Sequence, residues 1–465
     1  MSLHFGLSEV EGHRSRGGAG PPKHLLFDCR WPEGIIWAGM RLRLVALMAA
    51  LAAAFAAPAG AHAQGLDQTC ELSATRFDPD TVNVLFPDQS AQYWSADYVA
   101  VPGTRIRIDG IFPHSRYTSW NVYDPVLRPF AKLSDYQLAP DSGSANPFLP
   151  GADRTTPVSE RHYTTFITFS PTDNPGPNTI YVDPSQHPNG VFTLRVYEPD
   201  VGLDATGGVG LPQVTWEPTS STGPPPISSP CQTFEKPSSS ALTQFYTGQS
   251  GPPGPPYPGR NPPVWHKFVN VCQSGADLLL DNDFGGQPPT ATPNPCANFG
   301  SGGFLSNLDI SYVYAFTSTG FGPLLVFHGR APTFAATYPN APVMPSGEQV
   351  RYWSFCQNDP VTERYIACSR DDQVKTDAAG NYTIVVSPPA AWSQAAANRC
   401  RATVSWIPWG PQPDGVMIYR QMLPDPSFTQ AIQNVSYGSE QQQMGPYYPA
   451  GKYFSRWQDV AKAFC

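Results

Sequence analysis

The chain has 465 residues, more than one compact core usually holds, so its length favours at least two domains. Proline (53 residues) and glycine (40 residues) are frequent and only 14% of residues are charged, which favours short strands joined by turns over long helices. The formal net charge of −8 gives no reason to expect a nucleic-acid partner, because binding nucleic acid needs a basic surface.

The first recognisable element, residues 40–63, has the three parts of a secretory signal peptide. Arg41 and Arg43 give a positive start, residues 44–57 are an uninterrupted apolar run, and small residues precede a cleavage point after Ala63. The apolar run is shorter than the roughly 20 residues that span a bilayer. The segment therefore predicts export of a mature chain that begins near residue 64.

Residues 1–39 show no periodicity, and we interpret them as a mis-assigned start upstream of the true initiator, Met40. No second long apolar run follows, so no transmembrane segment is predicted after cleavage. The alanine-rich apolar run is bacterial in style. The expected location is secreted, either extracellular or periplasmic.

The cysteines agree with an oxidising compartment, because after cleavage their number is even and no C-x-x-C or Cys/His spacing typical of metal sites occurs. The eight are Cys70, Cys231, Cys272, Cys296, Cys356, Cys368, Cys400 and Cys465. Eight cysteines allow about 105 pairings. Pairing between neighbours is our prediction: Cys70–Cys231, Cys272–Cys296, Cys356–Cys368 and Cys400–Cys465.

A proline-, glycine- and serine-rich stretch over residues 218–263 cannot bury a core and predicts an extended linker. It separates a first module, residues 66–217, from a second module, residues 264–465. Three blocks recur in the same order in both modules, which predicts an internal repeat. The matching stretches are Ser115–Pro125 with Val350–Pro360, Gln137–Gly143 with Gln373–Gly380, and Pro188–Asp200 with Pro413–Asp425.

The repeated blocks read as β-strands. Residues 104–108 alternate polar and apolar side chains, as a strand with one buried face requires. In residues 192–197 the same alternation predicts that Thr193, Arg195 and Tyr197 face solvent. Strands at this spacing predict a mostly β fold of two related antiparallel β-sandwiches of jelly-roll type, with few short helices.

The order of these motifs resembles a bacterial jelly-roll module known as domain of unknown function 1214. The residues that carry the resemblance are Arg351–Ser354, Asn381–Val386, Trp406–Gly410 and Gly415–Arg420 in the second module, and Arg116–Tyr117, Tyr123–Asp124, Thr179–Val182 and Gly190–Arg195 in the first. The chain departs from that family in carrying the module twice, in its cysteines and in lacking the usual first domain. The family has no settled activity, so the resemblance implies fold and export only.

Motifs that would carry catalysis are missing. No G-x-S-x-G occurs, and the five histidines after the signal stand singly. Carboxylates gather at Asp371 and Asp372, which a polysaccharide hydrolase would need within a cleft. A second group around Asp277 hints at calcium but misses the EF-hand spacing, so we expect a solvated loop there.

Two further features have open interpretations. Arg116 and Arg351 recur within the repeat, either pairing a buried acid such as Asp124 or Asp359 or lining a groove. Aromatic residues on predicted strands of the second module could be exposed and stack on sugars or lipids, with core packing as the alternative. They are Trp265, Tyr312, Tyr314, Trp353, Trp406, Trp409 and Tyr419.

The sequence therefore leaves three hypotheses. The preferred one is an exported, envelope-associated protein that binds a glycan or an apolar ligand, with Trp353, Trp406, Trp409, Arg351 and Tyr419 as candidate ligand-binding residues. The alternatives are a secreted hydrolase built from carboxylates and a purely structural surface protein. No metal or cofactor is predicted, and a glycan or a cell-envelope component is the expected partner.

Overall fold

A computed structural model describes residues 69–70, 72, 76–77, 83, 85–220, 259–283, 296, 299–335, 341–360, 362–393, 400 and 402–465. The side chains of residues 278–283 are outside this description. The leader, the signal peptide, most of the linker and Cys231 also lie outside it. The predictions for those segments, including the Cys70–Cys231 bond, therefore stay predictions.

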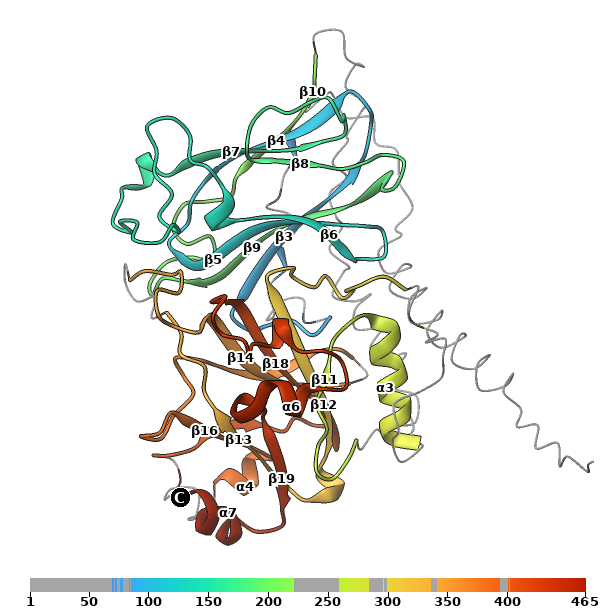
Figure 1. Cartoon of the computed structure of the whole chain (residues 1–465), viewed down its shortest axis with the longest axis vertical. Helices are drawn as coiled ribbons and strands as arrows, with labels where there is room; N and C mark the ends of the chain where they lie inside the picture. Colours follow the sequence, from blue (N-terminus) through green and yellow to red (C-terminus); the bar gives the residue numbers. More distant parts are fainter. Residues whose placement is uncertain are drawn as a thin grey trace, which may run out of the picture. The chain divides into compact units, whose positions relative to one another are not determined.

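The first module consists of two sheets that together form a β-sandwich (Figure 1). One sheet has the order β2–β3–β9–β5–β6, with strands Arg76–Phe77, Ala91–Val99, Asn189–Pro199, Ser115–Tyr123 and Pro129–Ser134. The other has the order β1–β10–β4–β7–β8, with strands Thr69–Cys70, Gln213–Pro218, Thr104–Ile111, His162–Thr168 and Thr179–Tyr181. Two 3₁₀ turns, η2 (Asp135–Gln137) and η3 (Val158–Glu160), lie in the connections.

The second module is also a sandwich of two sheets. One has the order β11–β12–β18–β14–β15, with strands His266–Lys267, Ile310–Ser318, Asp414–Pro424, Val350–Asn358 and Tyr365–Arg370. The other has the order β17–β16–β13–β19, with strands Ser405–Pro408, Asn381–Ser387, Leu324–Arg330 and Ala450–Phe454. Its helical pieces are α3 (Val271–Asp283), η4 (Thr319–Phe321), α4 (Pro389–Trp392), η5 (Ile432–Asn434), α6 (Glu440–Met444), η6 (Gly445–Tyr447) and α7 (Trp457–Phe464). The expected mostly β fold with few short helices is confirmed.

The strand orders of the two modules correspond: β3–β9–β5–β6 matches β12–β18–β14–β15, and β10–β4–β7–β8 matches β19–β13–β16–β17. In each module one pair is parallel, β7 with β8 and β16 with β17, while the other pairs are antiparallel. The register shifts between Val122 and Tyr123 in β5 and between Gln357 and Asn358 in β14. These bulges fall at the same place in the two repeated sequence blocks.

Large apolar side chains fill the space between the sheets of each module. Trp120, Phe192 and Trp216 are buried in the first core, and Trp353 and Phe355 in the second. In β4 the predicted alternation is confirmed, because buried and partly exposed residues alternate along the whole strand. These positions explain why the sequence pattern of such strands could be read directly.

Strand β9 behaves differently, and the prediction that Thr193, Arg195 and Tyr197 face solvent is wrong. All three side chains are buried. The reason is that this face of the sheet packs against the second module. A hydrophobic cluster that draws residues from both modules lies there: Ala91, Tyr117, Tyr197, Ile310, Tyr352 and Met422. We call this contact between sheet β2–β3–β9–β5–β6 and sheet β11–β12–β18–β14–β15 the seam.

Three disulfides are formed: Cys272–Cys296, Cys356–Cys368 and Cys400–Cys465. They are three of the four bonds that pairing between neighbours predicts. Cys356 and Cys368 are directly opposite each other on β14 and β15, and Cys400–Cys465 ties the C-terminal residue after α7 to the chain near β17. Within the part of the chain that the structure describes, no helix is long and apolar enough to cross a membrane.

Candidate functional site

The seam contains two reciprocal ion pairs between the modules. Arg116 of β5 donates to Asp371 at 2.5 Å, and Arg351 of β14 donates to Asp135 at 2.8 and 2.9 Å. Both side chains of both pairs are 0% exposed. The arginines and the aspartates occupy matching positions in the two repeats, so each module supplies one charge of each sign. Arg116 and Arg351 thus pair buried acids, as the structural interpretation expected, but the acids belong to the opposite module and are not Asp124 and Asp359.

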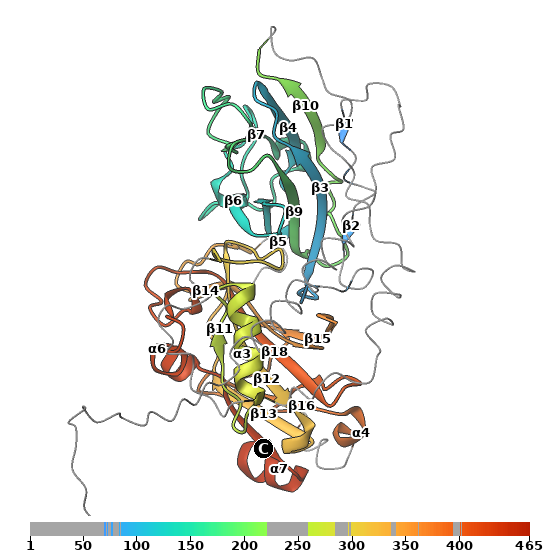
Figure 2. The same cartoon turned by 90° about the vertical axis from the view of Figure 1, so that its right-hand side faces the viewer.

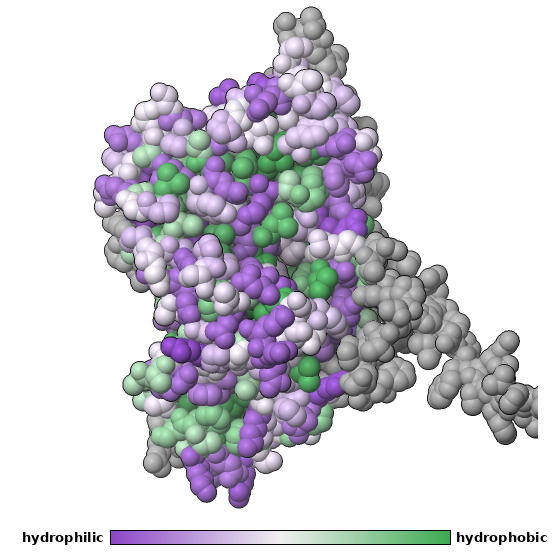
Figure 3. Space-filling view, in the orientation of Figure 1, coloured by the Kyte–Doolittle hydropathy of each residue, from purple (hydrophilic) through white to green (hydrophobic). Residues whose placement is uncertain are grey.

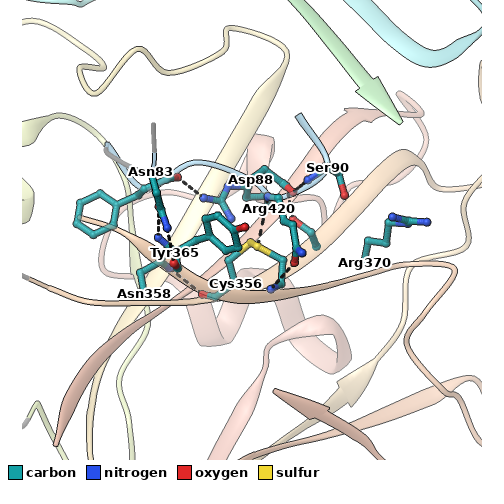
Figure 4. The surroundings of a disulfide bond; sticks show 12 residues. Asn83, Asp88, Ser90, Cys356, Asn358, Tyr365, Arg370 and Arg420 are labelled. Carbon is teal, nitrogen blue, oxygen red and sulfur yellow. Dashed lines mark hydrogen bonds between the residues drawn. A yellow bond between two sulfur atoms is a disulfide. The ribbon is translucent and has the colours of Figure 1, made fainter. Parts of the chain in front are cut away.

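Each module also lays a strap, the segment before its first long strand, across the other module. The strap of the first module includes Asn83, which forms two hydrogen bonds with the backbone of Tyr365, and Phe86, whose carbonyl accepts from Arg420 at 2.6 Å. Figure 4 shows this strap beside the Cys356–Cys368 disulfide. Asp88 on the strap accepts hydrogen bonds from the hydroxyls of Tyr352 and Ser354.

The strap of the second module repeats the arrangement on the first module. Arg195, the counterpart of Arg420, donates to the carbonyl of Leu305. Tyr117, the counterpart of Tyr352, donates to Asp309 at 2.6 Å, and Lys132 also pairs with Asp309. Because this exchange is mutual and buried, the seam holds the two sandwiches together on both sides.

Burial controls the acidity of the seam carboxyls. Desolvation raises the pKa of Asp371 to about 6, although Arg116 and the backbone N–H of Trp353 lower it in part. Desolvation likewise raises the pKa values of Asp135 and Glu198. Glu363, whose backbone carbonyl accepts from the N–H of Phe86 on the strap, is buried, and desolvation raises its pKa to about 7.

The aromatic residues predicted to bind a ligand do not form an exposed surface. Trp353, Trp409 and Tyr419 are at most 1% exposed, and Arg351 is fully buried in its ion pair. Trp353 and Tyr419 pack in the core, because β14 and β18 are central strands covered on both faces. Tyr419 stacks on Phe355 with 4.2 Å between the ring centroids. Trp406, on the edge strand β17, is partly exposed and stacks on Trp392. Hydrophobic and hydrophilic residues are interspersed on the face shown in Figure 3.

The acids proposed for hydrolysis are also committed elsewhere. Asp371 is fully buried beneath Arg116, and Asp372 pairs with Arg370 at 2.7 Å. Asp88, Cys356 and Cys368 bring three potential metal-binding atoms within 4.8 Å of one another, but the two sulfurs are bonded to each other. The buried Asp371 carboxylate and the two bonded sulfurs therefore offer no accessible chemistry, whereas Asp372 is exposed.

A different cluster does bring chemically versatile side chains together near the surface. Asp277 of α3 accepts hydrogen bonds from the phenol groups of Tyr314 and of Tyr437, the latter at 2.5 Å. The Nδ1 atom of His266 lies 4.0 Å from the Asp277 carboxylate oxygen that accepts from Tyr314. We call His266, Asp277, Tyr314 and Tyr437 the donor cluster. Asp277 and Tyr314 are buried, whereas His266 and Tyr437 are partly exposed.

Four separate segments position the donor cluster. His266 is on β11, which pairs with β12 so that His266 lies directly opposite Tyr314. Helix α3 lies beside these strands (Figure 2) and is fixed at its first turn by the Cys272–Cys296 disulfide. Glu440 fixes the segment that contains Tyr437, because its carboxylate accepts hydrogen bonds from the backbone N–H groups of Lys267 and Gly438. The tyrosine at position 437 is thereby held next to β11.

In this state the donor cluster is a carboxylate surrounded by neutral hydrogen-bond donors. Gln273 donates to Asp277 at 2.9 Å in addition to the two phenols. Desolvation, followed by the nearby carboxylate, raises the pKa of Tyr314 well above its usual value. Desolvation and hydrogen bonding to Asp277 also raise the pKa of Tyr437. Both phenols therefore keep their protons at neutral pH.

Sequence reasoning named members of this cluster but did not connect them. Asp277 was expected in a solvated loop, and that expectation is wrong, because residues 271–283 form a helix that buries Asp277 against the sheet. His266 was one of the single histidines, and Tyr437 was not singled out. They are 171 positions apart along the chain, so no local spacing could have revealed the site.

Comparisons with known proteins give a distant structural likeness and no family. No known protein family matches the chain, and no curated protein sequence matches it. A putative uncharacterized protein from Burkholderia cenocepacia is similar in structure, with 13% identity, 92% of this chain and 91% of that chain covered, and a TM-score of 0.44. The VPA0106 protein from Vibrio parahaemolyticus shares 12% identity over 80% of this chain and 90% of that one, with a TM-score of 0.38. The resemblance to domain of unknown function 1214 stays a prediction.

Proposed function

We propose that the chain is an exported binding protein in which two sandwiches, derived by duplication of one jelly-roll module, form a rigid frame. The seam supports the rigid frame, since it buries reciprocal ion pairs and exchanged straps. Three disulfides support export, because such bonds persist mainly in oxidising compartments. The binding site is the donor cluster on the second module.

The observation that carries this proposal is the difference between the modules at one matching position. Tyr314 on β12 corresponds to Ser95 on β3, whose hydroxyl bonds to Thr193 of the neighbouring strand at 2.8 Å. In the second module, by contrast, an imidazole, a carboxylate and two phenols from four segments converge. Buried polar groups need partners, and a frame does not need this group to close its sheet.

The test is the mass of the exported protein from its own host, recorded first denatured and then under native conditions. The denatured mass gives the start of the mature chain and shows whether the thiol hydrogens are missing. We expect an excess mass in the native spectrum that the Asp277→Asn variant loses. The matched control is Asp183→Asn, which changes an exposed carboxylate of the first module. An excess that Asp277→Asn retains would contradict the site.

A purely structural surface protein is the second candidate. The seam favours this function, because the contact buries many polar and charged side chains of both modules. The two functions predict different results. A structural protein would show no excess native mass, and neither cations nor small ligands would raise its melting temperature. The binding function requires at least one ligand that raises the melting temperature in wild type and not in Asp277→Asn.

A further inference from the structure

The donor cluster has the composition and spacing of a metal site in its metal-free form. The phenol oxygens of Tyr314 and Tyr437 and the Nδ1 atom of His266 all lie within 4.0 Å of a carboxylate oxygen of Asp277. Ligand atoms bound at about 2.0–2.2 Å from one ion lie about 3 Å from each other. Small side-chain movements would therefore bring the four groups around a single cation.

Charge decides which cation fits. With both phenols ionised, Asp277, Tyr314 and Tyr437 carry three negative charges, and a neutral imidazole adds none. The carboxylate and Tyr314 are buried, and a buried site that keeps net charge is strongly disfavoured. With both phenolates bound, a divalent ion would leave one uncompensated negative charge, and it would reach neutrality only if one phenol kept its proton and did not bind as a phenolate. A trivalent ion would leave the cluster neutral.

Ligand type narrows the choice further. Anionic oxygen atoms from carboxylate and phenolate are hard ligands, imidazole is a common ligand for iron, and tyrosine is a known protein ligand of iron. Soft ions prefer thiolates, and the cysteine of helix α3, Cys272, is held in a disulfide. From these contacts we propose that the donor cluster binds a ferric ion, Fe3+, through His266, Asp277, Tyr314 and Tyr437. This inference rests on the proposed binding function and names its ligand.

Protons balance the binding step. In the metal-free protein both phenols donate to Asp277, so they are protonated. An incoming Fe3+ replaces those two protons, and each phenolate oxygen forms a bond to iron as its proton leaves to solvent. No oxidation or reduction takes place. A bound cation favours the deprotonated form of its ligands, so iron binding weakens as the pH falls.

Two members of the donor cluster are partly exposed, and they mark the side from which an ion would enter. His266 retains 15% of its side-chain exposure, and Tyr437 lies in the segment between η5 and α6. The opposite side is closed by the sheet and by α3, which the Cys272–Cys296 disulfide anchors. An ion can therefore enter past His266 and Tyr437 without separating α3 from β12.

The experiment loads the full, disulfide-bonded chain with Fe3+ supplied as its nitrilotriacetate chelate at neutral pH, followed by desalting. We expect one iron per chain to remain, with a visible phenolate-to-iron absorption band, while the released nitrilotriacetate and the solvent take up the two phenol protons. Ga3+, which has no such band, should displace the iron and bleach the colour. Wild-type protein that retains no iron would overturn the proposal.

Tyr437→Phe is the decisive variant, because Tyr437 is partly exposed and its loss removes only one hydroxyl. Iron should bind at least about tenfold more weakly, and the absorption band should lose intensity. Tyr181→Phe, which changes an exposed phenol of the first module, is the matched control and should behave as wild type. An unchanged band in Tyr437→Phe would overturn the assignment. Should this variant misfold by near-ultraviolet circular dichroism, His266→Gln tests the affinity instead: it removes one ligand and leaves both phenols, so iron should bind more weakly, and unchanged iron binding would overturn the assignment.

The iron-loading and native-mass experiments together distinguish a wrong ferric assignment from a wrong binding function. If the chain retains no iron but its native mass shows an excess that Asp277→Asn loses, the ferric assignment is wrong and the binding function stands. If neither iron nor any excess mass is found, both the assignment and the binding function are wrong.

Discussion

The two modules share a frame and differ in what is built on it. Their sheets have corresponding strand orders, with a parallel pair and a bulge at matching places. The first module closes its sheet at Ser95 with a single hydroxyl contact, whereas the second carries Tyr314, the added helix α3 and the Asp277 carboxylate at the matching place. The three disulfides described also belong to the second module. The second module thus combines the shared frame with polar groups that the first module lacks at the matching place.

The largest expected effect comes from breaking the seam that the two modules share. Replacing Asp135 with Ala leaves Arg351 buried without its carboxylate, and we expect the free energy of unfolding to fall by about 3–5 kcal/mol. Chemical denaturation measures this loss. The matched control is Arg107→Ala, which removes an exposed ion pair with Asp109 and should cost less than about 1 kcal/mol.

A double variant sharpens the same point. Asp135→Leu combined with Arg351→Met removes both charges, so it should be clearly more stable than Asp135→Ala alone. If the single and double variants were equally unstable, shape and not charge would hold the seam.

The next effect concerns the disulfides that distinguish the second module. Cys465→Ser opens the bond to Cys400 and frees α7, and we expect a loss of about 2–4 kcal/mol, because the bond closes a loop of 65 residues. Thermal unfolding with and without reductant checks it. Reductant cannot open this bond in the variant, because the bond is already missing. Full reduction should therefore lower the stability of the wild type by at least as much as the Cys465→Ser substitution does. Eight titratable thiols in the native protein would contradict the disulfides altogether.

A smaller pair of substitutions compares the modules at the matching position. Tyr314→Phe removes a hydrogen bond to the Asp277 carboxylate and should cost about 1.5–3 kcal/mol. Ser95→Ala removes a neutral hydrogen bond to Thr193 and should cost about 0.5–1.5 kcal/mol. Urea unfolding of both variants gives the comparison. Equal losses would mean that Asp277 is held by its other donors.

The last effect is a dependence on pH. Desolvation raises the pKa of Glu363 to about 7 and that of Asp371 to about 6, so the folded protein holds these protons more tightly than the unfolded chain. Stability from such groups is present in acid and is lost as the pH rises through their folded pKa values. We expect the melting temperature to be higher near about pH 5 than near about pH 8.

Glu363→Gln isolates one contribution to that dependence. The amide cannot ionise, so the variant should gain stability relative to wild type above about pH 7 and gain little near about pH 5. Glu160→Gln, at an exposed position in η3, should leave the profile unchanged. A Glu363→Gln profile that runs parallel to that of wild type would contradict the raised pKa.

The sequence by itself determined the features that local patterns predict: individual strands, matching strands in the two modules and pairs of cysteines. Alternation in residues 104–108 gave a strand with one buried face, and the recurrence of Ser115–Pro125 as Val350–Pro360 pointed to matching strands. Pairing of cysteines that follow one another in the chain gave three bonds, and one of them, Cys356–Cys368, joins two strands linked by a short connection. These features depend on contacts near in the chain, where side-chain periodicity is a sufficient guide.

Only the tertiary structure decided which faces meet. Tyr197 and Arg195 have the pattern of an outward face, yet the second module covers them. Trp353 and Tyr419 are buried in a different place, the core between the two sheets of the second module. His266 and Tyr437 meet at Asp277 although they are far apart in sequence. A two-residue alternation of polar and apolar side chains indicates that a strand has two different faces. Whether the second face meets water or another sheet depends on how the sheets pack.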